Sequence, residues 1–166
     1  MIVTVTPYLA LPRWPYRLGQ QTKADHDTLA LAKALVPMRY AGFVPADDPA
    51  LRYGLALNDA GFFWEAHEIL EAVWKVAPQR GRDRILLRAC IQVANANLKL
   101  SLQRPRAAYR LLQEALSELD ELAIRPPADV AGSFSEHFPV VVLASAIAHQ
   151  LALEETERVL IQISEV

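Results

Sequence analysis

Three side chains that could carry chemistry lie close together in the sequence: His67, Glu68 and Glu71. In a helix, His67 and Glu71 stand four residues apart and meet on one face. An imidazole beside carboxylates can act as an acid–base pair or bind a divalent metal ion. We therefore take Glu68 or Glu71 as the candidate general base, and His67 as the candidate acid or metal ligand.

A metal site at this position would need ligands from elsewhere in the chain. Transition metals accept neutral imidazole and carboxylate groups, and they take about three or four protein ligands in total. Two or three ligands on one helix fall short of a full set, so another histidine would have to complete it. The candidates are His26, His137 and His149. Neither a His-Glu-x-x-His motif nor a pair of Glu-x-x-His motifs is present, so the zinc-protease and di-iron patterns are not predicted.

These residues stand on a predicted helix from Phe62 to Val76. On a helical wheel its apolar residues form one arc: Phe62, Phe63, Ala66, Ile69, Leu70, Val73 and Trp74. Trp64, His67 and Glu71 line one edge of this arc, with Glu68 just beyond it. Glu65 falls on the opposite flank, and we expect it in solvent.

The predicted helix from Asp83 to Leu102 could supply polar partners. It is apolar nearly all round, so we expect it at the centre of the fold. Its polar residues share one narrow strip that would form a semi-buried pocket if it faced the His67 edge. The candidate pocket residues are Asn58, Trp64, His67, Glu68, Glu71, Arg88, Gln92, Asn95 and Lys99, of which His67, Glu68 and Glu71 are the metal candidates.

Three interpretations of this pocket remain open. Glu68 or Glu71 could pair with Arg88 or Lys99 in a purely structural network between helices. The same groups could bind a small molecule or a protein partner, or they could form a metal-dependent hydrolytic site. Cys90, inside the central apolar helix, is expected to be a small buried side chain rather than a nucleophile.

Four further helices are predicted from apolar periodicity and end signals. Their ranges are Asp25 to Leu35, Pro49 to Ala60, Pro105 to Ala123, and Pro139 to Glu155. Asp25 is a candidate N-cap, Asp47-Asp48-Pro49 is a candidate helix start with a capping aspartate, and Gly61 is a candidate C-terminal glycine. The run Val140 to Val142 could instead open a strand. Residues 159–163 could form a short strand or a frayed tail.

The first 24 residues are predicted to form an extended arm, because Pro7, Pro12 and Pro15 interrupt any helix. Its aromatic residues Tyr8, Trp14 and Tyr16 are expected to pack on the helical body. Alternatively, Arg13 or Arg17 could reach into the site.

Two helix pairs show related spacing of small and large residues. Ala66, Leu70 and Val73 in the first pair correspond to Ala108, Leu112 and Ala115 in the second. The offset exceeds the roughly 34 residues of a tetratricopeptide unit. We therefore expect tetratricopeptide-like antiparallel pairs within one bundle, and no extended solenoid.

The motif N-x-x-G-x-x-W-E-A-H-E-x-x-E-x-x-W, from Asn58 to Trp74, resembles the bacterial and archaeal domain-of-unknown-function family numbered 309. The later I-Q-x-A at residues 91–94, Lys99, and the stretch 107–112 are similar to the same family. The resemblance covers residues 49–122 and implies an all-helical fold. Some members carry the label of predicted metal-dependent hydrolases. Residues 15–17 are similar to an extension of some members, whereas the segment after Pro126 matches no pattern of the family.

Composition restricts the class of protein. The chain has 166 residues, 52% hydrophobic and 22% charged, with a net charge of −2, which is typical of one globular domain. No basic excess indicates nucleic-acid binding, and the most apolar run is shorter than the roughly 20 residues of a membrane span. A single cysteine allows no internal disulfide and favours a reducing cytoplasm.

We therefore expect one all-α domain, a compact antiparallel bundle of about six helices. It comprises an arm (1–24), a family-like core (49–123) and a C-terminal helical extension (126–166). The leading hypothesis is a binding or scaffold module with a semi-buried polar network. The alternative is a metal-dependent hydrolase that uses His67, Glu68 and Glu71. Self-association through an apolar face of the last helix, Val140 to Leu153, is a third possibility.

Overall fold

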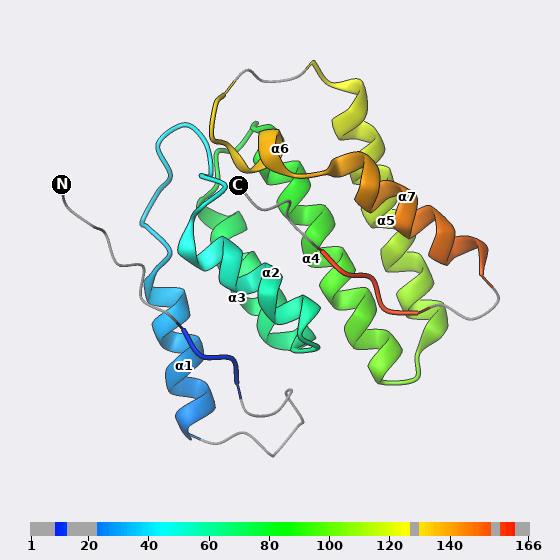
Figure 1. Cartoon of the computed structure of the whole chain (residues 1–166), viewed down its shortest axis with the longest axis horizontal. Coiled ribbons are helices and arrows are strands. Elements are labelled where there is room, and N and C mark those ends of the chain that lie inside the picture. The colour runs from blue at the N-terminus through cyan, green and yellow to red at the C-terminus, as the bar shows by residue number, and fades with distance from the viewer. Residues whose placement is uncertain (1–8, 13–22, 127–129, 154–156, 162–166) are drawn as a thin grey trace.

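The computed structural model describes residues 9–12, 23–126, 130–153 and 157–161 (Figure 1). Over these residues the chain is all-helical and contains no named strand, which confirms the predicted fold class. The helices are α1 (Lys23–Ala34), α2 (Pro49–Asp59), α3 (Phe63–Val76), α4 (Arg82–Ser101), α5 (Pro105–Ile124), α6 (Phe134–His137) and α7 (Val140–Ala152).

The ends of α2 follow directly from the local sequence. The Asp48 carboxylate accepts a hydrogen bond from the Leu51 amide at 2.9 Å, and Pro49 takes the first helical position. Gly61, at φ +93°, closes the helix in a conformation that side chains disfavour. Both predicted signals are therefore confirmed. Asp25, by contrast, lies inside α1, because that helix begins two residues earlier.

Helices α2 and α3 approach closely at Gly54. A Cβ atom built there would lie 2.9 Å from Leu70 Cδ2 and 3.3 Å from Ile69 Cγ2. Because Leu70 and Ile69 are fully buried, a larger side chain at residue 54 would separate the two helices. This contact fixes the face that α3 buries, and thereby fixes its polar edge.

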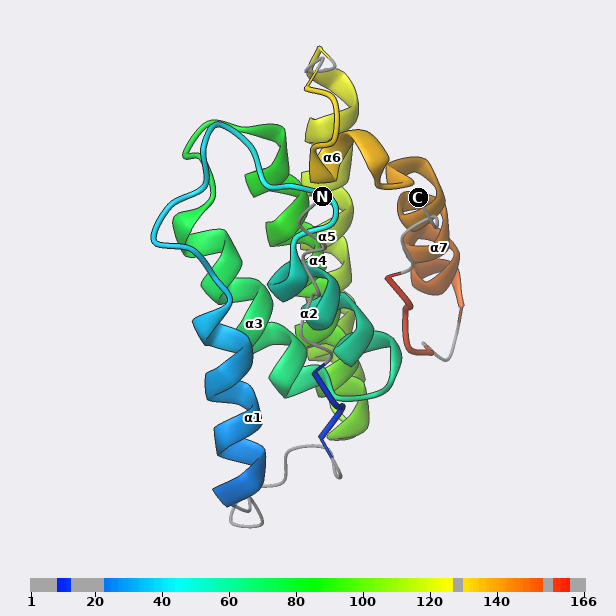
Figure 2. The ribbon, with the colours of Figure 1, turned by 60° about the vertical axis from the view of Figure 1, so that its left-hand side comes forward.

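Helix α4 is central, as its all-round apolar pattern predicted. It packs against both α3 and α5, while α1 lies against α3 and α7 lies against α5 (Figure 2). One cluster of buried apolar side chains draws members from all seven helices and from residues 157–161. The likeness of these pairs to tetratricopeptide units stays a prediction.

A buried carboxylate joins distant loops to the start of α4. Asp83 accepts hydrogen bonds from the Val44 and Ser135 amides, each at 2.8 Å. The one-turn helix α6, which the sequence pattern did not predict, is held here because Phe134 also donates from its amide to Val44. Ser133 caps α6 by accepting a hydrogen bond from the Glu136 amide.

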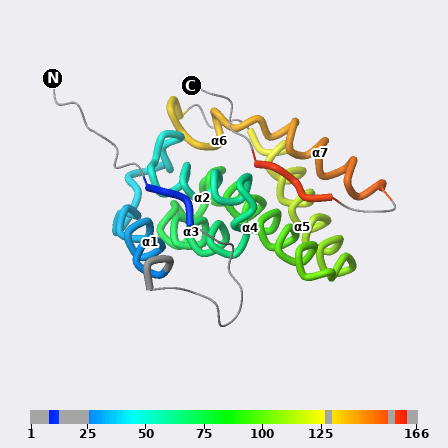
Figure 3. The backbone as a smooth tube through the Cα atoms, turned by 60° about the horizontal axis from the view of Figure 1, so that its bottom comes forward, coloured from blue at the N-terminus to red at the C-terminus, as the bar shows by residue number. Residues whose placement is uncertain are grey.

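The C-terminal region is a helix followed by an extended segment (Figure 3). Residues 140–142 are helical, so the strand alternative for them is wrong. Residues 157–161, which we call the strap, form neither a strand nor a frayed tail, because Val159 and Ile161 are almost fully buried. Residues 154–155 and 162–163 lie outside the described part of the chain.

Only residues 9–12 of the predicted arm are described before α1, and they are not helical. The Tyr53 hydroxyl donates a hydrogen bond to the Ala10 carbonyl at 2.8 Å and so fixes this piece on α2. Residues 23 and 24 belong to α1, which corrects the predicted boundary. Tyr8, Arg13, Trp14, Tyr16 and Arg17 lie outside the described residues.

Within the described ranges, every helix is too short or too polar to cross a lipid bilayer.

Candidate functional site

Helix α3 presents His67, Glu68 and Glu71 together, and we call these three residues the His67 cluster. One possible ligand atom from each lies within 4.8 Å of the others. The Nδ1 atom of His67 is buried and has no hydrogen-bond partner among the described residues. Glu68 Oε1 is 3.7 Å away, close enough for an ion pair when the imidazole is protonated but too far for a hydrogen bond.

Two lysines hold the carboxylates of the His67 cluster. Lys33 reaches from α1 and places its Nζ 2.7 Å from Glu68 Oε2. Lys75, one turn along α3, lies 3.3 Å from Glu71 Oε2. The predicted structural network paired these glutamates with residues of α4, and that pairing is wrong. The physical reason is that α1 packs on this side of α3 and brings its own cation (Figure 2).

The donor set of the His67 cluster fits a divalent transition metal. Imidazole nitrogen and carboxylate oxygen suit zinc and related ions, and three protein ligands leave positions for water or substrate. A buried imidazole nitrogen without a partner is a costly arrangement that a bound ion would relieve. Both lysines engage Oε2 atoms, so Oε1 of each glutamate is not committed to them.

The other histidines do not complete the ligand set. Within the described ranges, no further His, Cys, Asp or Glu joins this group. His26 and His149 are exposed on α1 and α7, and His137 lies on α6 beside Glu136. A metal bound by the His67 cluster would therefore take at most three ligands from these parts of the protein.

Glu65 is buried, with 6% of its surface exposed, which corrects the prediction that it faces solvent. Helix α3 is covered on more than one side, because α2 packs over the flank that the wheel left open. Burial raises the pKa of Tyr53 to about 12, and the negative charge of Glu65 adds to this effect. Trp64 is half-buried beside it.

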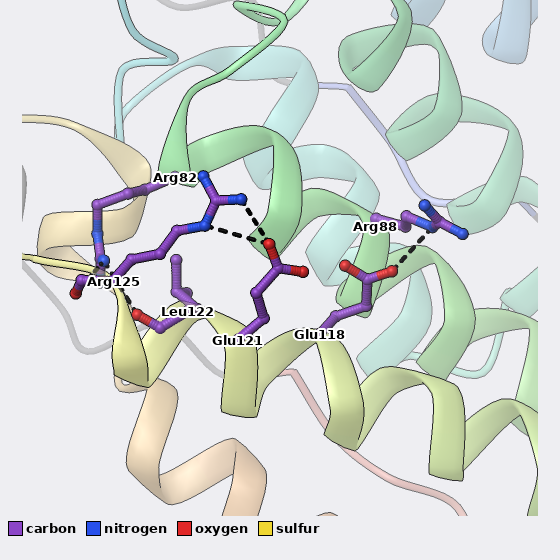
Figure 4. A network of polar contacts seen from close by, with 6 residues as sticks. All are labelled: Arg82, Arg88, Glu118, Glu121, Leu122 and Arg125. Carbon is purple, nitrogen blue, oxygen red and sulfur yellow. Dashed lines mark hydrogen bonds and ion pairs between the residues drawn. The ribbon is translucent and has the colours of Figure 1, made fainter.

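The polar strip of α4 finds its partners on α5. Arg88 pairs with Glu118 at 3.0 Å (Figure 4), and Gln92 donates a hydrogen bond to Glu114 at 2.6 Å. Burial raises the pKa of Glu118, Arg88 lowers it, and the nearby glutamates Glu121 and Glu114 raise it. Asn95 and Lys99 are half-buried on the same helix.

A groove of about 490 Å³ opens where α3, α4 and α5 meet. Trp74 forms one wall, with the Arg84 guanidinium 4.0 Å from the centre of its ring. Arg84 also donates hydrogen bonds to two carbonyls at the end of α3, and Arg82 does the same for the end of α5 (Figure 4). These arginines therefore cap helix C-termini, where a positive charge is favourable.

Asn58 belongs to a third polar group, at the junction of α2, α4 and the strap. Its amide accepts a hydrogen bond from Asn97 Nδ2 at 2.9 Å, and both side chains bond the backbone of Val159. Asn97 did not appear among the predicted site residues, because it lies off the predicted polar strip. A polar residue on an otherwise apolar part of α4 was the signal that could have found it.

Seven of the nine predicted pocket residues thus fall into three groups. Trp64, His67, Glu68 and Glu71 share α3, Arg88 and Gln92 contact α5, and Asn58 contacts the strap; Asn95 and Lys99 are half-buried on α4. Lys33 joins the first group and was not predicted, since it lies 35 residues from Glu68 in the sequence.

Cys90 is fully buried in the core, as predicted. Burial raises the pKa of its thiol well above the usual range, so the reactive thiolate is disfavoured. This cysteine is therefore a packing residue.

Comparison with known proteins finds a match to a family model over part of the chain. Residues 51–111 match the model of the family described as Domain of unknown function (DUF309). No curated protein and no solved structure matches the chain. The matched region runs from the start of α2 into α5 and contains the complete His67 cluster.

Proposed function

We propose a role from the geometry of the site, because the family model that residues 51–111 match has a description that names no activity. The chain is a helical binding module, and its His67 cluster takes a divalent metal ion. His67 Nδ1 and one oxygen each of Glu68 and Glu71 are the ligands. Lys33 and Lys75 pair with the Oε2 atoms of the two carboxylates.

The observation that carries this proposal is the buried Nδ1 atom of His67. The described residues offer it no hydrogen-bond partner, although native proteins satisfy nearly all buried polar atoms. A structural role alone would favour a histidine bonded to a neighbouring acceptor. Glu68 Oε1 lies 3.7 Å from this nitrogen, and one ligand atom each of His67, Glu68 and Glu71 lies within 4.8 Å of the others, so a cation is the ligand that best fits it.

A second candidate function, metal-dependent hydrolysis, is favoured by the small number of protein ligands. A bound ion would supply Lewis-acid activation of water or of a carbonyl group at positions that the protein leaves open. In this alternative, one of Glu68 and Glu71 would not bind the ion and would instead accept the proton from the attacking water. The half-buried Trp64 is one turn away on the same helix and would form an apolar wall of such a site.

The proposal is tested by titrating Zn²⁺, and in separate runs Mn²⁺, into untagged apoprotein in a calorimeter. We expect one ion per chain. The matched pair of variants is His67→Ala, which removes the central ligand, and His149→Ala, which removes an exposed histidine on α7. His67→Ala should abolish the binding, and His149→Ala should retain it.

Two results would count against the proposal. Less than about a tenth of an equivalent of bound ion in the wild-type protein would exclude a metal site. Equal binding by wild type and His67→Ala would place the ion elsewhere. The hydrolytic candidate additionally requires activity on generic ester or phosphoester substrates that appears with the metal and disappears in Glu68→Gln or Glu71→Gln.

A further inference from the structure

The groove where α3, α4 and α5 meet is rich in arginine, and we call it the arginine groove. Its volume of about 490 Å³ is within the range of roughly 300–1,000 Å³ that small-molecule sites occupy. Its charged lining residues are Arg80, Arg84, Arg88, Arg125, Glu118 and Glu121. The positive charge of these four arginines exceeds the negative charge of the two glutamates by two, although the whole chain carries a net charge of −2.

Arg84 is held in a fixed position at the wall of the arginine groove. Its Nη1 atom donates hydrogen bonds to the carbonyls of Trp74 and Ala77, at 2.7 Å and 3.0 Å, and its guanidinium lies 4.0 Å from the centre of the Trp74 ring. Among the residues that the structure describes, the N–H groups on Nε and Nη2 have no partner. A guanidinium that is already held in place loses little entropy when it binds an anion.

Arg80 and Arg88 add further donors to the groove. Arg80 is exposed and forms no ion pair with any residue in the described ranges. Arg88 pairs with Glu118 through Nε at 3.0 Å, and its side chain is 58% exposed. Arg125 differs, because both Nε and Nη2 donate to Glu121 on the other side of the row of carboxylates (Figure 4). Guanidinium groups that can accept a further anion therefore lie at the start of α4.

The arginine groove also has an apolar part. Trp74 and Ile85 line it, and both are half-buried. An aromatic ring can pack against an indole, and it can stack on the plane of a guanidinium group. The lining thus joins an apolar wall to a set of cationic hydrogen-bond donors. This combination fits an organic anion better than a bare inorganic ion.

We propose that the arginine groove binds a small phosphate monoester with an aromatic body. Arg80, Arg84 and Arg88 hold the phosphate, and Trp74 and Ile85 contact the body. A phosphate monoester carries a charge of about −1.5 to −2 at neutral pH, which matches the excess positive charge of the lining. Guanidinium groups bind phosphate oxygens through strong charge-assisted hydrogen bonds. This site takes an anion and does not depend on the metal ion proposed for the His67 cluster.

The test is a calorimetric titration of 1-naphthyl phosphate into the full-length chain, in EDTA so that no metal ion takes part. We expect one ligand per chain with a Kd below about 1 mM, a value typical of a ligand of this size. Inorganic phosphate, which lacks the ring, and 1-naphthol, which lacks the charge, should each bind at least roughly tenfold more weakly. The singly charged 1-naphthoate should also bind more weakly than the phosphate ester.

Two arginines give a matched pair of variants. Arg80 lines the groove, whereas Arg110 is exposed on α5 and does not line it. Because both side chains are exposed, either can be replaced without loss of the fold. Arg80→Ala should weaken the binding of 1-naphthyl phosphate at least roughly threefold, since a charge-assisted hydrogen bond is lost, and Arg110→Ala should change it by less than about twofold.

Glu118→Gln is expected to strengthen the binding. The substitution removes a negative charge from the lining and leaves Arg88 to the phosphate, so the affinity should rise roughly two- to fivefold. A residue with a purely structural role would not produce this gain. Weaker binding by Glu118→Gln would overturn the proposal.

The site is located by the indole N–H resonances in ¹H–¹⁵N spectra, assigned with Trp74→Phe and Trp64→Phe. The Trp74 resonance should shift during the titration with 1-naphthyl phosphate and saturate at one equivalent. The Trp64 resonance should stay in place, because Trp64 does not line the groove. A Trp74 resonance that does not move would overturn the proposal.

Four outcomes of the titrations would also overturn it. No binding of 1-naphthyl phosphate at about 1 mM would mean that the groove is not a site for this class of ligand. Equal affinity for inorganic phosphate would show that no organic body is recognised. Equal affinity for 1-naphthoate would remove the preference for phosphate. Equal effects of Arg80→Ala and Arg110→Ala would place the anion outside the groove.

Discussion

Asn58 and Asn97, which we call the asparagine clamp, are fully buried. They and the half-buried His67 cluster differ in how their polar atoms are satisfied. The amides of Asn58 and Asn97 make hydrogen bonds to each other and to the strap. The Nδ1 atom of His67 makes none within the described part of the chain, although its neighbours Glu68 and Glu71 both do.

This difference indicates that the asparagine clamp contributes to stability and that the His67 cluster contributes to ligand binding. A satisfied buried amide contributes to folding, and its removal leaves partners without hydrogen bonds. A buried imidazole nitrogen without a partner contributes nothing by hydrogen bonding, and its retention in the fold is explained by a ligand. The comparison therefore predicts that substitutions at the clamp lower stability, whereas substitutions at the His67 cluster change binding.

The largest effect is expected for Asn97→Ala. This change leaves the Val159 amide without its acceptor. It also removes the N–H group that donates to the Val159 carbonyl and to Asn58 Oδ1. We expect the free energy of unfolding to fall by roughly 2–4 kcal/mol, because each buried unsatisfied group costs about 1–3 kcal/mol. Urea denaturation followed by circular dichroism measures it.

Asn95→Ala is the matched control, since Asn95 is only half-buried on the same helix. It should change the free energy of unfolding by no more than about 0.5 kcal/mol. Equal losses at the two positions would remove the special role of the clamp.

A smaller effect on stability is expected for His67→Ala. The ring is largely covered but its Nδ1 atom is unbonded, so only packing is lost, at about 1 kcal/mol or less. The same variant should lose the increase in melting temperature that Zn²⁺ gives the wild-type protein. A loss as large as that of Asn97→Ala would instead assign His67 to a structural network.

A modest gain in binding is expected for Lys33→Met. Lys33 is partly exposed and competes with any cation for Glu68. Its removal should strengthen Zn²⁺ binding by roughly two- to fivefold, since an exposed ion pair contributes about 0.2–1 kcal/mol. Calorimetric titration measures the change, and weaker Zn²⁺ binding would show that the lysine supports the site and does not compete with it.

The smallest effect is expected for Glu118, which lines the groove where α3, α4 and α5 meet. This residue belongs to neither the asparagine clamp nor the His67 cluster. Its pKa is raised in the folded protein, chiefly by burial, so folding favours the protonated carboxyl. The stability that this provides is present below the pKa of the unfolded chain and is lost as the pH rises through the folded pKa. The melting temperature of Glu118→Gln, relative to that of the wild type, should therefore rise with pH across the acidic range, and a difference that falls with pH would contradict the assignment.

Local signals in the sequence predicted much of this fold. Asp48, Pro49 and Gly61 mark the ends of α2 because capping depends only on adjacent residues. The spacing of His67 and Glu71 brings them together because one helix contains both.

These local signals could not predict contacts between residues that are far apart in the sequence. Lys33 meets Glu68 only because α1 packs on α3, and Asn97 meets Val159 across 62 residues. Glu65 was misplaced because a helical wheel shows one apolar arc and cannot show that α2 covers a second flank.

The most direct test of the central claim is an ¹H–¹⁵N spectrum of the histidine imidazole nitrogens during titration with Zn²⁺. We predict that Nδ1 of His67 shifts and saturates at one equivalent, while the nitrogens of His26, His137 and His149 stay unchanged. A titration in which the His67 resonances do not move, or in which the exposed histidines move first, would contradict a metal site in the His67 cluster.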